Sequence, residues 1–166
     1  MRMRKGSRGV TLIELCFGLA VVATLAGLAI PQFRAQLRAS AVRAATFELL
    51  AALQQVRAAS IVEGRRGVLC LCDAAGNCQP DGAQTGAWQA FLEVDGRPTL
   101  VTAQSLPAGV ELRSSRSRLT FWPDSLAAST GTLTICDAQG SAAPRAIVIS
   151  QGGRARVVAP AKSGCR

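Results

Sequence analysis

The sequence predicts an α+β protein in which a long N-terminal helix, half membrane-spanning and half amphipathic, packs on a small antiparallel β-sheet head domain. Three observations predict this fold. An apolar run covers Val10 to Ile30, an apolar stripe with helical spacing follows Pro31, and short apolar or alternating runs separated by turn residues begin near Gly67. The chain of 166 residues is long enough for one globular domain besides the helix.

Residues 10–31 form the predicted membrane-spanning half of the helix. The 21 residues from Val10 to Ile30 would span roughly 30 Å, the thickness of the hydrocarbon core of a bilayer. Glu14 is the one charged residue in this run, and a carboxylate inside a membrane is costly unless it has a partner or a purpose. We expect Pro31 to bend the helix, because proline removes a backbone donor and crowds the preceding turn.

Residues 32–64 form the predicted amphipathic half, and residues 32–63 contain neither Gly nor Pro. Together the two halves predict one helix of about 50 residues. Apolar residues recur with alternating gaps of three and four, which predicts the helix face that packs on the head: Val42, Ala45, Leu49, Ala52, Val56 and Ala59.

Residues 65–166 are predicted to form the β-rich head. Short apolar or alternating runs such as "GVLCLC", "AWQAFLEV", "GTLTIC" and "RAIVIS" are candidate strands, and turn formers such as "DAAGN", "PAG" and "DAQG" separate them. Because each aromatic residue of the head lies in an apolar run, we expect core packing for Trp88, Phe91, Phe121 and Trp122.

The net charge of +9 and the pI near 10.6 favour an anionic partner such as nucleic acid or lipid head groups. Part of this charge has another explanation. Four basic residues precede the apolar run and are typical of a cytoplasmic positive-inside signal, so removal of residues 1–9 takes the charge from +9 to +5: Arg2, Arg4, Lys5 and Arg8.

The composition argues against an enzyme. The chain has no His, which removes the commonest general base and metal ligand, and no nucleophile elbow, phosphate loop or metalloprotease motif occurs. The cysteines form no C-x₂-C pair, so we expect no metal site and no cofactor.

The cysteines favour disulfides. Cys16 lies in the apolar run, and five further cysteines lie in the part expected to be exported. We predict that Cys136 and Cys165 join the C-terminal tail to a strand. Cys78 is predicted to close a small loop with Cys70 or Cys72, which alternation places on one face of a strand, and one cysteine is left over.

The N-terminus resembles the class III signal of type IV pilins and pseudopilins. Its pattern stands here as a basic leader followed by Gly9, Val10, Thr11, Leu12, Ile13 and Glu14, with Val10 in place of the usual Phe. The resemblance implies that prepilin peptidase removes residues 1–9 by cleavage after Gly9 and that Val10 is N-methylated. It also implies that Glu14 pairs with a terminal amine, of its own or a neighbouring subunit, during fibre assembly.

The head resembles the FimT/GspH family of minor pilins. The order of five segments carries the resemblance: "VLCLCDAAGNC", "GAWQAFLEVDG", "LTFWPDS", "GTLTICD" and "AIVISQGGRARV". In this family, GspH-type members are minor pseudopilins of type II secretion, whereas FimT-type members belong to type IV pili and some bind DNA during natural transformation. The resemblance implies other major and minor pilins as partners.

The segment Gly153-Arg154-Ala155-Arg156 favours the FimT type. In an extended chain Arg154 and Arg156 project on the same side about 7 Å apart, and each guanidinium can form a fork with a phosphate. No acidic residue follows Asp137, whereas further basic residues do: Arg145, Lys162 and Arg166. Such a tail predicts salt-dependent binding of double-stranded DNA without sequence preference.

Two functions therefore remain open. The first is a FimT-type minor pilin that binds DNA for uptake, and the alternative is a purely structural pseudopilin or priming subunit whose arginines only keep an edge strand soluble. We expect a solvated strand face for Arg113, Arg116 and Arg118. Both functions imply a single-pass protein of the bacterial inner membrane with a periplasmic head, which later enters an extracellular pilus or a pseudopilus.

Overall fold

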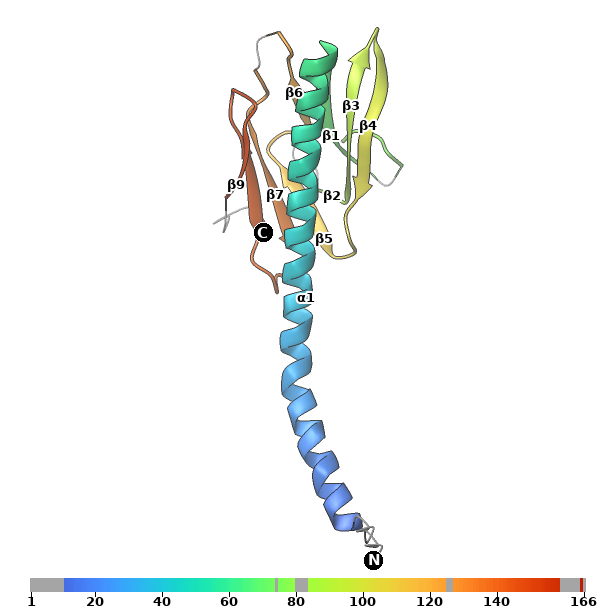
Figure 1. Cartoon of the computed structure of the whole chain (residues 1–166), viewed down its shortest axis with the longest axis vertical. Coiled ribbons are helices and arrows are strands. Elements are labelled where there is room, and N and C mark those ends of the chain that lie inside the picture. The colour runs from blue at the N-terminus through green and yellow to red at the C-terminus, as the bar shows by residue number, and fades with distance from the viewer. Residues whose placement is uncertain (1–10, 74, 80–83, 125–126, 159–164, 166) are drawn as a thin grey trace, which may run out of the picture. The chain divides into compact units, whose positions relative to one another are not determined.

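The computed structural model describes residues 11–73, 75–79, 84–124, 127–158 and 165, which form one helix and nine strands (Figure 1). The helix is α1, Leu12–Glu63. The strands are β1 Arg66–Cys72, β2 Gln84–Thr85, β3 Ala87–Val94, β4 Arg97–Ser105, β5 Val110–Ser114, β6 Arg118–Phe121, β7 Gly131–Asp137, β8 Arg145–Ile149 and β9 Ala155–Val158.

Helix α1 contributes to two compact units of the chain, residues 1–36 and residues 37–166. In the first unit the described side chains are almost all exposed. Here α1 is long and apolar enough to cross a membrane, and its most apolar window of 18 residues has a mean hydropathy of 2.2. Helical structure continues through Pro31. The helix ends where Gly64 adopts a φ of 62° and the Arg65 N–H donates to Ser60 O, as at many helix C-termini.

In the second unit α1 buries one face against the head. Five of the six residues of the predicted stripe are at most 3% exposed: Val42, Ala45, Leu49, Ala52 and Val56. The expectation for Ala59 was wrong, because Ala59 is half-buried and Ser60 takes the buried position. The Ser60 hydroxyl is satisfied there, because it donates to Arg65 O at 2.6 Å.

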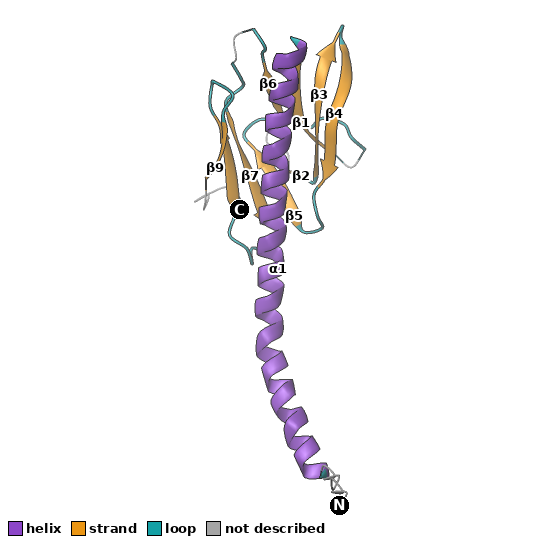
Figure 2. Cartoon of the chain, in the orientation of Figure 1, coloured by secondary structure: helices purple, strands orange, loops and turns teal. Residues whose placement is uncertain are grey.

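The strands form two antiparallel sheets, shown with α1 in Figure 2. The four-stranded sheet has the order β4-β3-β1-β6, and the five-stranded sheet has the order β2-β5-β7-β8-β9. Inward-facing side chains of both sheets join the buried face of α1 in a single core, among them Leu69, Leu71, Leu133, Ile135 and Ile147. This arrangement confirms the predicted α+β fold.

A second, smaller cluster lies on the outer face of the four-stranded sheet. It consists of Val68, Cys70, Cys72 and Phe91, with Ala87 packed against it. Since these residues alternate with the core-facing Leu69 and Leu71 of β1, they belong to the opposite face of the strand. The four-stranded sheet therefore has buried apolar residues on both faces.

Candidate anion-binding edge of the head

The turn between β8 and β9 carries the Gly-Arg-x-Arg segment at the edge of the five-stranded sheet. Hydrogen bonds close it: the Gly153 N–H donates to Ser150 O at 2.9 Å, and the Ser150 N–H donates to Arg154 O at 3.1 Å. The Arg154 N–H also donates to the Ser150 hydroxyl at 3.3 Å. Arg154 is thus fixed by its backbone immediately before β9 begins.

Glycine is required at position 153 for two reasons. Its φ of 70° lies in the left-handed region, which side chains other than glycine avoid. A Cβ atom at this position would also lie 3.0 Å from Arg57 Nε and 3.4 Å from Ala128 Cβ. The glycine of the segment therefore lets the turn approach α1 and the loop before β7.

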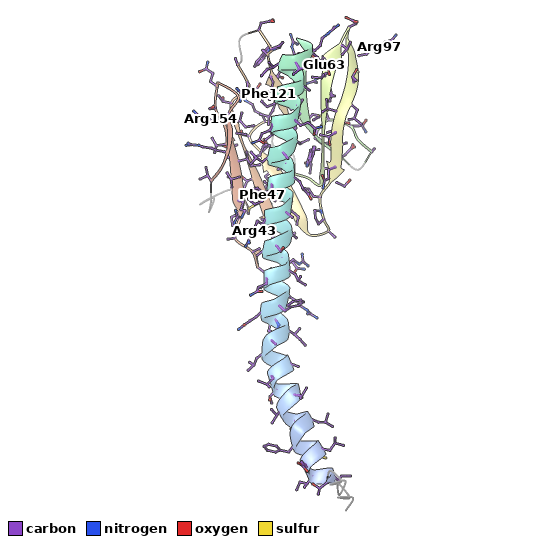
Figure 3. The ribbon with its side chains drawn as sticks, viewed as in Figure 1. Arg43, Phe47, Glu63, Arg97, Phe121 and Arg154 are labelled. Atoms are coloured by element: carbon purple, nitrogen blue, oxygen red, sulfur yellow. A yellow bond between two sulfur atoms is a disulfide. The ribbon has the colours of Figure 1, made fainter. Side chains whose placement is uncertain are left out.

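Arg154 and Arg156 are exposed, whereas Ala155 and Val157 pack against the core. Arg156 pairs in register with Val148 of β8. Alternation along the extended chain directs both side chains to the outer side, with their Cα atoms about 7 Å apart. Figure 3 shows Arg154 beside the β8–β9 hairpin, at the margin of the head in this view.

The other basic residues of the tail are arranged differently. Arg145 is half-buried at the start of β8, opposite Ile135 of β7. It shares a strand face with Ile147, and three residues, or about 10 Å, separate it from Val148, the partner of Arg156. The structure therefore does not bring Arg145 to Arg154 and Arg156. Lys162 lies outside the described residues.

The charge of this edge is not neutralised within the part of the head that the structure describes. No ion pair joins a described acidic residue to Arg145, Arg154 or Arg156, whereas five other arginines each form one: Arg38, Arg65, Arg66, Arg113 and Arg118. Arg113 and Arg118, expected on a solvated strand face, pair with Glu111 and Glu93. The β8–β9 edge is thus a cationic surface available to an anion.

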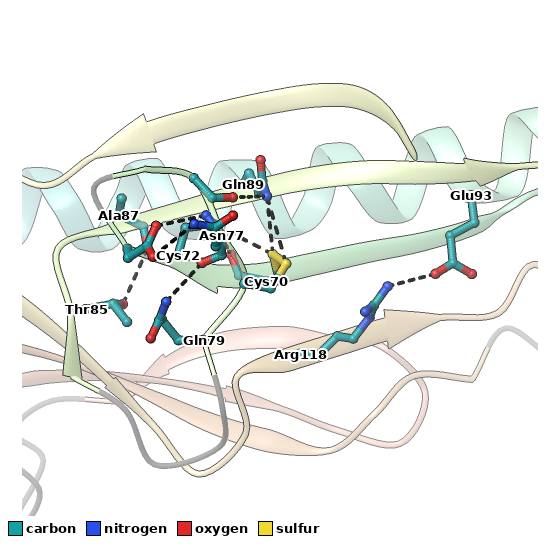
Figure 4. The surroundings of a disulfide bond; sticks show 12 residues. Cys70, Cys72, Asn77, Gln79, Thr85, Ala87, Gln89, Glu93 and Arg118 are labelled. Carbon is teal, nitrogen blue, oxygen red and sulfur yellow. Dashed lines mark hydrogen bonds and ion pairs between the residues drawn. A yellow bond between two sulfur atoms is a disulfide. The ribbon is translucent and has the colours of Figure 1, made fainter. Parts of the chain in front are cut away.

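A disulfide joins each sheet to a segment outside it. Cys136 of β7 is bonded to Cys165, which anchors the C-terminal tail to the five-stranded sheet. Cys70 of β1 is bonded to Cys78, so of the two pairings left open by the sequence the structure contains the one with Cys70 (Figure 4).

Cys72 and Cys16 keep free thiols. Burial raises the pKa of the Cys72 thiol, so the thiol form is favoured. The sulfur atoms of Cys70, Cys72 and Cys78 lie within 4.8 Å of one another, a spacing that one metal ion could bridge. Because the disulfide uses two of these three sulfurs, the oxidised cluster does not form such a site.

The aromatic residues of the β-rich head are mainly structural. Trp88, Phe91 and Phe121 are buried, and the Arg118 guanidinium lies 5.6 Å from the Phe91 ring centroid. The expectation of core packing was wrong for Trp122, which is 38% exposed. Trp122 follows the last residue of β6, so alternation directs it away from the face on which Phe121 is buried.

Glu14 lies in the first turn of α1 and is exposed. Its N–H donates to the Thr11 hydroxyl at 3.3 Å. Thr11 and Glu14 have the residue types and the spacing of a helix capping box, a signal that the sequence interpretation overlooked. Gly9 and Val10, the predicted cleavage and methylation positions, lie outside the described residues.

The fold defines the class of protein. A long N-terminal helix with an apolar first half, packed on antiparallel sheets through its second half, is the architecture of a pilin. The sequence model of the family described as Type II transport protein GspH matches residues 45–153, and the chain belongs to this family. It is accordingly a minor pilin or pseudopilin, as the resemblance to the FimT/GspH family implied.

Two solved structures have the same fold. Both are crystal structures of the type IV minor pilin FimU of Pseudomonas aeruginosa, in space groups P21 and P65. The first matches with a TM-score of 0.57 and 19% identity over 75% of this chain and 95% of the FimU chain. The second has a TM-score of 0.55 and 19% identity over 76% of this chain and 98% of the FimU chain. No curated protein sequence matches.

Proposed function

We propose that this chain is a FimT-type minor pilin that is incorporated into a type IV pilus and binds DNA without sequence preference during uptake for natural transformation. One observation carries the proposal. Arg154 and Arg156 project from the same side of an ordered sheet edge, and no described acidic residue forms an ion pair with either.

The chemistry of this edge suits a phosphate backbone. Each guanidinium can donate two parallel hydrogen bonds to phosphate oxygens. The edge has no group placed to read base edges in a groove, so the binding energy would come mainly from counterion release. We therefore expect an affinity that falls steeply with salt and depends little on sequence.

The N-terminal part of the proposal concerns assembly. Prepilin peptidase removes residues 1–9 at Gly9, and Val10 becomes the methylated N-terminus. Residues 10–31 then hold the protein in the inner membrane with residues 65–166 in the periplasm, and residues 32–64 support the head. Glu14 pairs with a terminal amine as the subunit joins other pilins. The exposed apolar side chains of the first unit and its membrane-compatible length support this part.

A structural pseudopilin of type II secretion is the second candidate. The family description favours it, and the matched residues end at Gly153, immediately before the arginines. Membership of the family is thus independent of Arg154 and Arg156. In this alternative the arginines are surface charges, and the protein contacts only other pilins.

DNA titrations of the full chain in a neutral detergent separate the two candidates. The wild type is compared with the double variant Arg154→Ala, Arg156→Ala at about 50 and 200 mM salt. The matched control is Arg43→Ala, Arg97→Ala, because both residues are exposed, carry the same charge and lie apart from Arg154 at the β8–β9 turn (Figure 3).

The proposal predicts that the first double variant loses roughly tenfold in affinity at low salt and that the slope of log affinity against log salt falls by about two. The control is expected to keep most of the affinity. Equal behaviour of the two double variants, or no binding by the wild type, would instead support the structural pseudopilin.

A further inference from the structure

Arg57 connects α1 to the turn that carries the Gly-Arg-x-Arg segment. It is half-buried next to the fully buried Val56, at the margin of the helix face that packs on the head. Its Nη2 donates a hydrogen bond to Gly152 O at 2.9 Å, across 95 positions of sequence. Its Nε lies 3.0 Å from the place that a Cβ of residue 153 would occupy.

The turn is also held from its other side. The Ala128 N–H donates to Gln151 O at 2.8 Å, and the Ala128 side chain lies next to Gly153. Three consecutive residues of the turn, Gln151 to Gly153, are therefore fixed between α1 and the loop before β7. Such preorganisation reduces the entropy that binding would otherwise cost.

The bond to Gly152 leaves most of the binding capacity of Arg57 unused. A guanidinium has five N–H donors, and a backbone carbonyl does not neutralise its charge. Within the described residues no acidic side chain forms an ion pair with Arg57. The Arg57 guanidinium is thus a positive charge with a fixed orientation. It contacts Gly152, which precedes Arg154 by two residues.

We propose that Arg57 is a third phosphate-binding arginine, and that the DNA site is composed of α1 together with the β8–β9 turn. This inference rests on the proposed function, because it concerns the same ligand. Arg57 holds the turn through Nη2 and donates its remaining N–H groups to a phosphate of the strand that Arg154 contacts. Sequence position gives no hint of this role, because Arg57 belongs to the long helix and not to the tail.

The test compares Arg57→Gln with Arg43→Gln in the full chain in neutral detergent, with a duplex DNA as the probe. Both variants remove one positive charge from the same helix, and Arg43 is exposed and about 21 Å away along the axis. Arg57→Lys keeps the charge and loses the guanidinium fork. Thermal unfolding of each variant shows whether the head remains folded.

We expect Arg57→Gln to lose about fivefold in affinity and to lower the salt slope by about one, whereas Arg43→Gln leaves the slope unchanged. Arg57→Lys should keep the slope and lose part of the affinity. A loss of slope in Arg57→Lys as large as in Arg57→Gln would overturn the phosphate contact, because the charge is present in the lysine variant.

The double variant Arg154→Ala, Arg156→Ala is measured alongside. It separates the proposed role of Arg57 from the proposed DNA-binding function of the tail. If it loses affinity while Arg57→Gln behaves like Arg43→Gln, the role of Arg57 is overturned and the DNA site of the tail stands. If the double variant binds like the wild type, the proposed function fails, and this inference fails with it.

Discussion

The neighbourhood of Glu93 on the four-stranded sheet and the β8–β9 edge of the five-stranded sheet differ in the partners of their arginines. On the four-stranded sheet Arg66 and Arg118 both pair with Glu93, at 3.4 and 2.9 Å. At the edge of the five-stranded sheet no described acidic residue pairs with Arg154 or Arg156. The net charge of a chain therefore does not locate an anion site. The position of the acidic residues decides which arginines stay available.

The sheets differ in their disulfides as well. Cys70–Cys78 closes a loop of 8 positions beside β1, whereas Cys136–Cys165 spans 29 positions and includes β8, β9 and the cationic edge. The longer loop restricts the unfolded chain more strongly. On the five-stranded sheet, the cationic edge thus lies inside the segment that a disulfide closes.

The largest expected effect follows from this difference. Cys165→Ser should cost about 3–4 kcal/mol of unfolding free energy, and Cys78→Ser about 2–3 kcal/mol, in the chain-entropy account of disulfides. Both variants leave the buried partner as a thiol. Urea unfolding of residues 37–166, which contain the whole main core, measures the two costs. A larger cost for Cys78→Ser would contradict the comparison.

Asp137 gives the next largest effect, because it is the buried acid of the five-stranded sheet. Its carboxylate has a side-chain exposure of 0% and accepts bonds from the Ser141 hydroxyl at 2.6 Å and the Ser141 N–H at 2.8 Å, and it pairs with Arg38 at 3.5 Å. We expect Asp137→Ala to cost about 3 kcal/mol. Glu93→Ala, on the exposed network of the other sheet, should cost about 1 kcal/mol or less. Urea unfolding at neutral pH checks both values.

The same carboxylate predicts how stability depends on pH. Burial raises the pKa of Asp137, but hydrogen bonds from Ser141, Gln139 and Ala142 lower it by more, so its pKa lies below the ordinary value. A lowered pKa gives stability that is complete well above the unfolded pKa of about 3.9 and is lost as the pH falls through the folded pKa. Asp137→Asn should therefore flatten the loss of unfolding free energy below about pH 5, as measured by urea titrations at decreasing pH.

Features that depend on local periodicity could be predicted from the sequence. The stripe from Val42 to Val56 and the alternation in β1 gave the helix face and the strand faces, because each repeats over several residues. Single positions at the ends of elements were less predictable. At the end of α1 Ser60 is buried in place of Ala59, and Trp122, one residue after the end of β6, lies outside the core.

Contacts between distant segments could not be predicted. The bond from Arg57 to Gly152 depends on how α1 packs against the β8–β9 turn, which no local pattern encodes. The partner of Cys78 was undecided for a related reason. Cys70 and Cys72 lie on the same strand face with their sulfur atoms 3.6 Å apart, so only the path of the loop selects between them.

Gly153 allows a comparison between the two disulfide-closed loops. Gly153 and Gly76 both have a positive φ, of 70° and 85°, but a Cβ would meet Arg57 only at Gly153. We expect Gly76→Ala to cost about 1 kcal/mol and Gly153→Ala about 1–2 kcal/mol of unfolding free energy. In DNA titrations Gly153→Ala should also weaken binding, because the turn that positions Arg154 shifts, whereas Gly76→Ala should not. If Gly76→Ala also lost DNA affinity, the loss in Gly153→Ala would come from general destabilisation of the head and not from a shift of the turn that positions Arg154.

The smallest expected effect, a change in DNA affinity, tests whether pairing with Glu93 keeps Arg66 and Arg118 from binding DNA. If pairing with acids is what keeps the arginines of the four-stranded sheet from binding DNA, Glu93→Gln should free Arg66 and Arg118 and raise the affinity roughly threefold, with a steeper salt slope. Glu63→Gln is the control, because it removes the same charge from an exposed residue at the end of α1. DNA titration at two salt concentrations compares the variants. Equal gains in both would mean that only net charge matters and that the arrangement of acids around the arginines does not select the site.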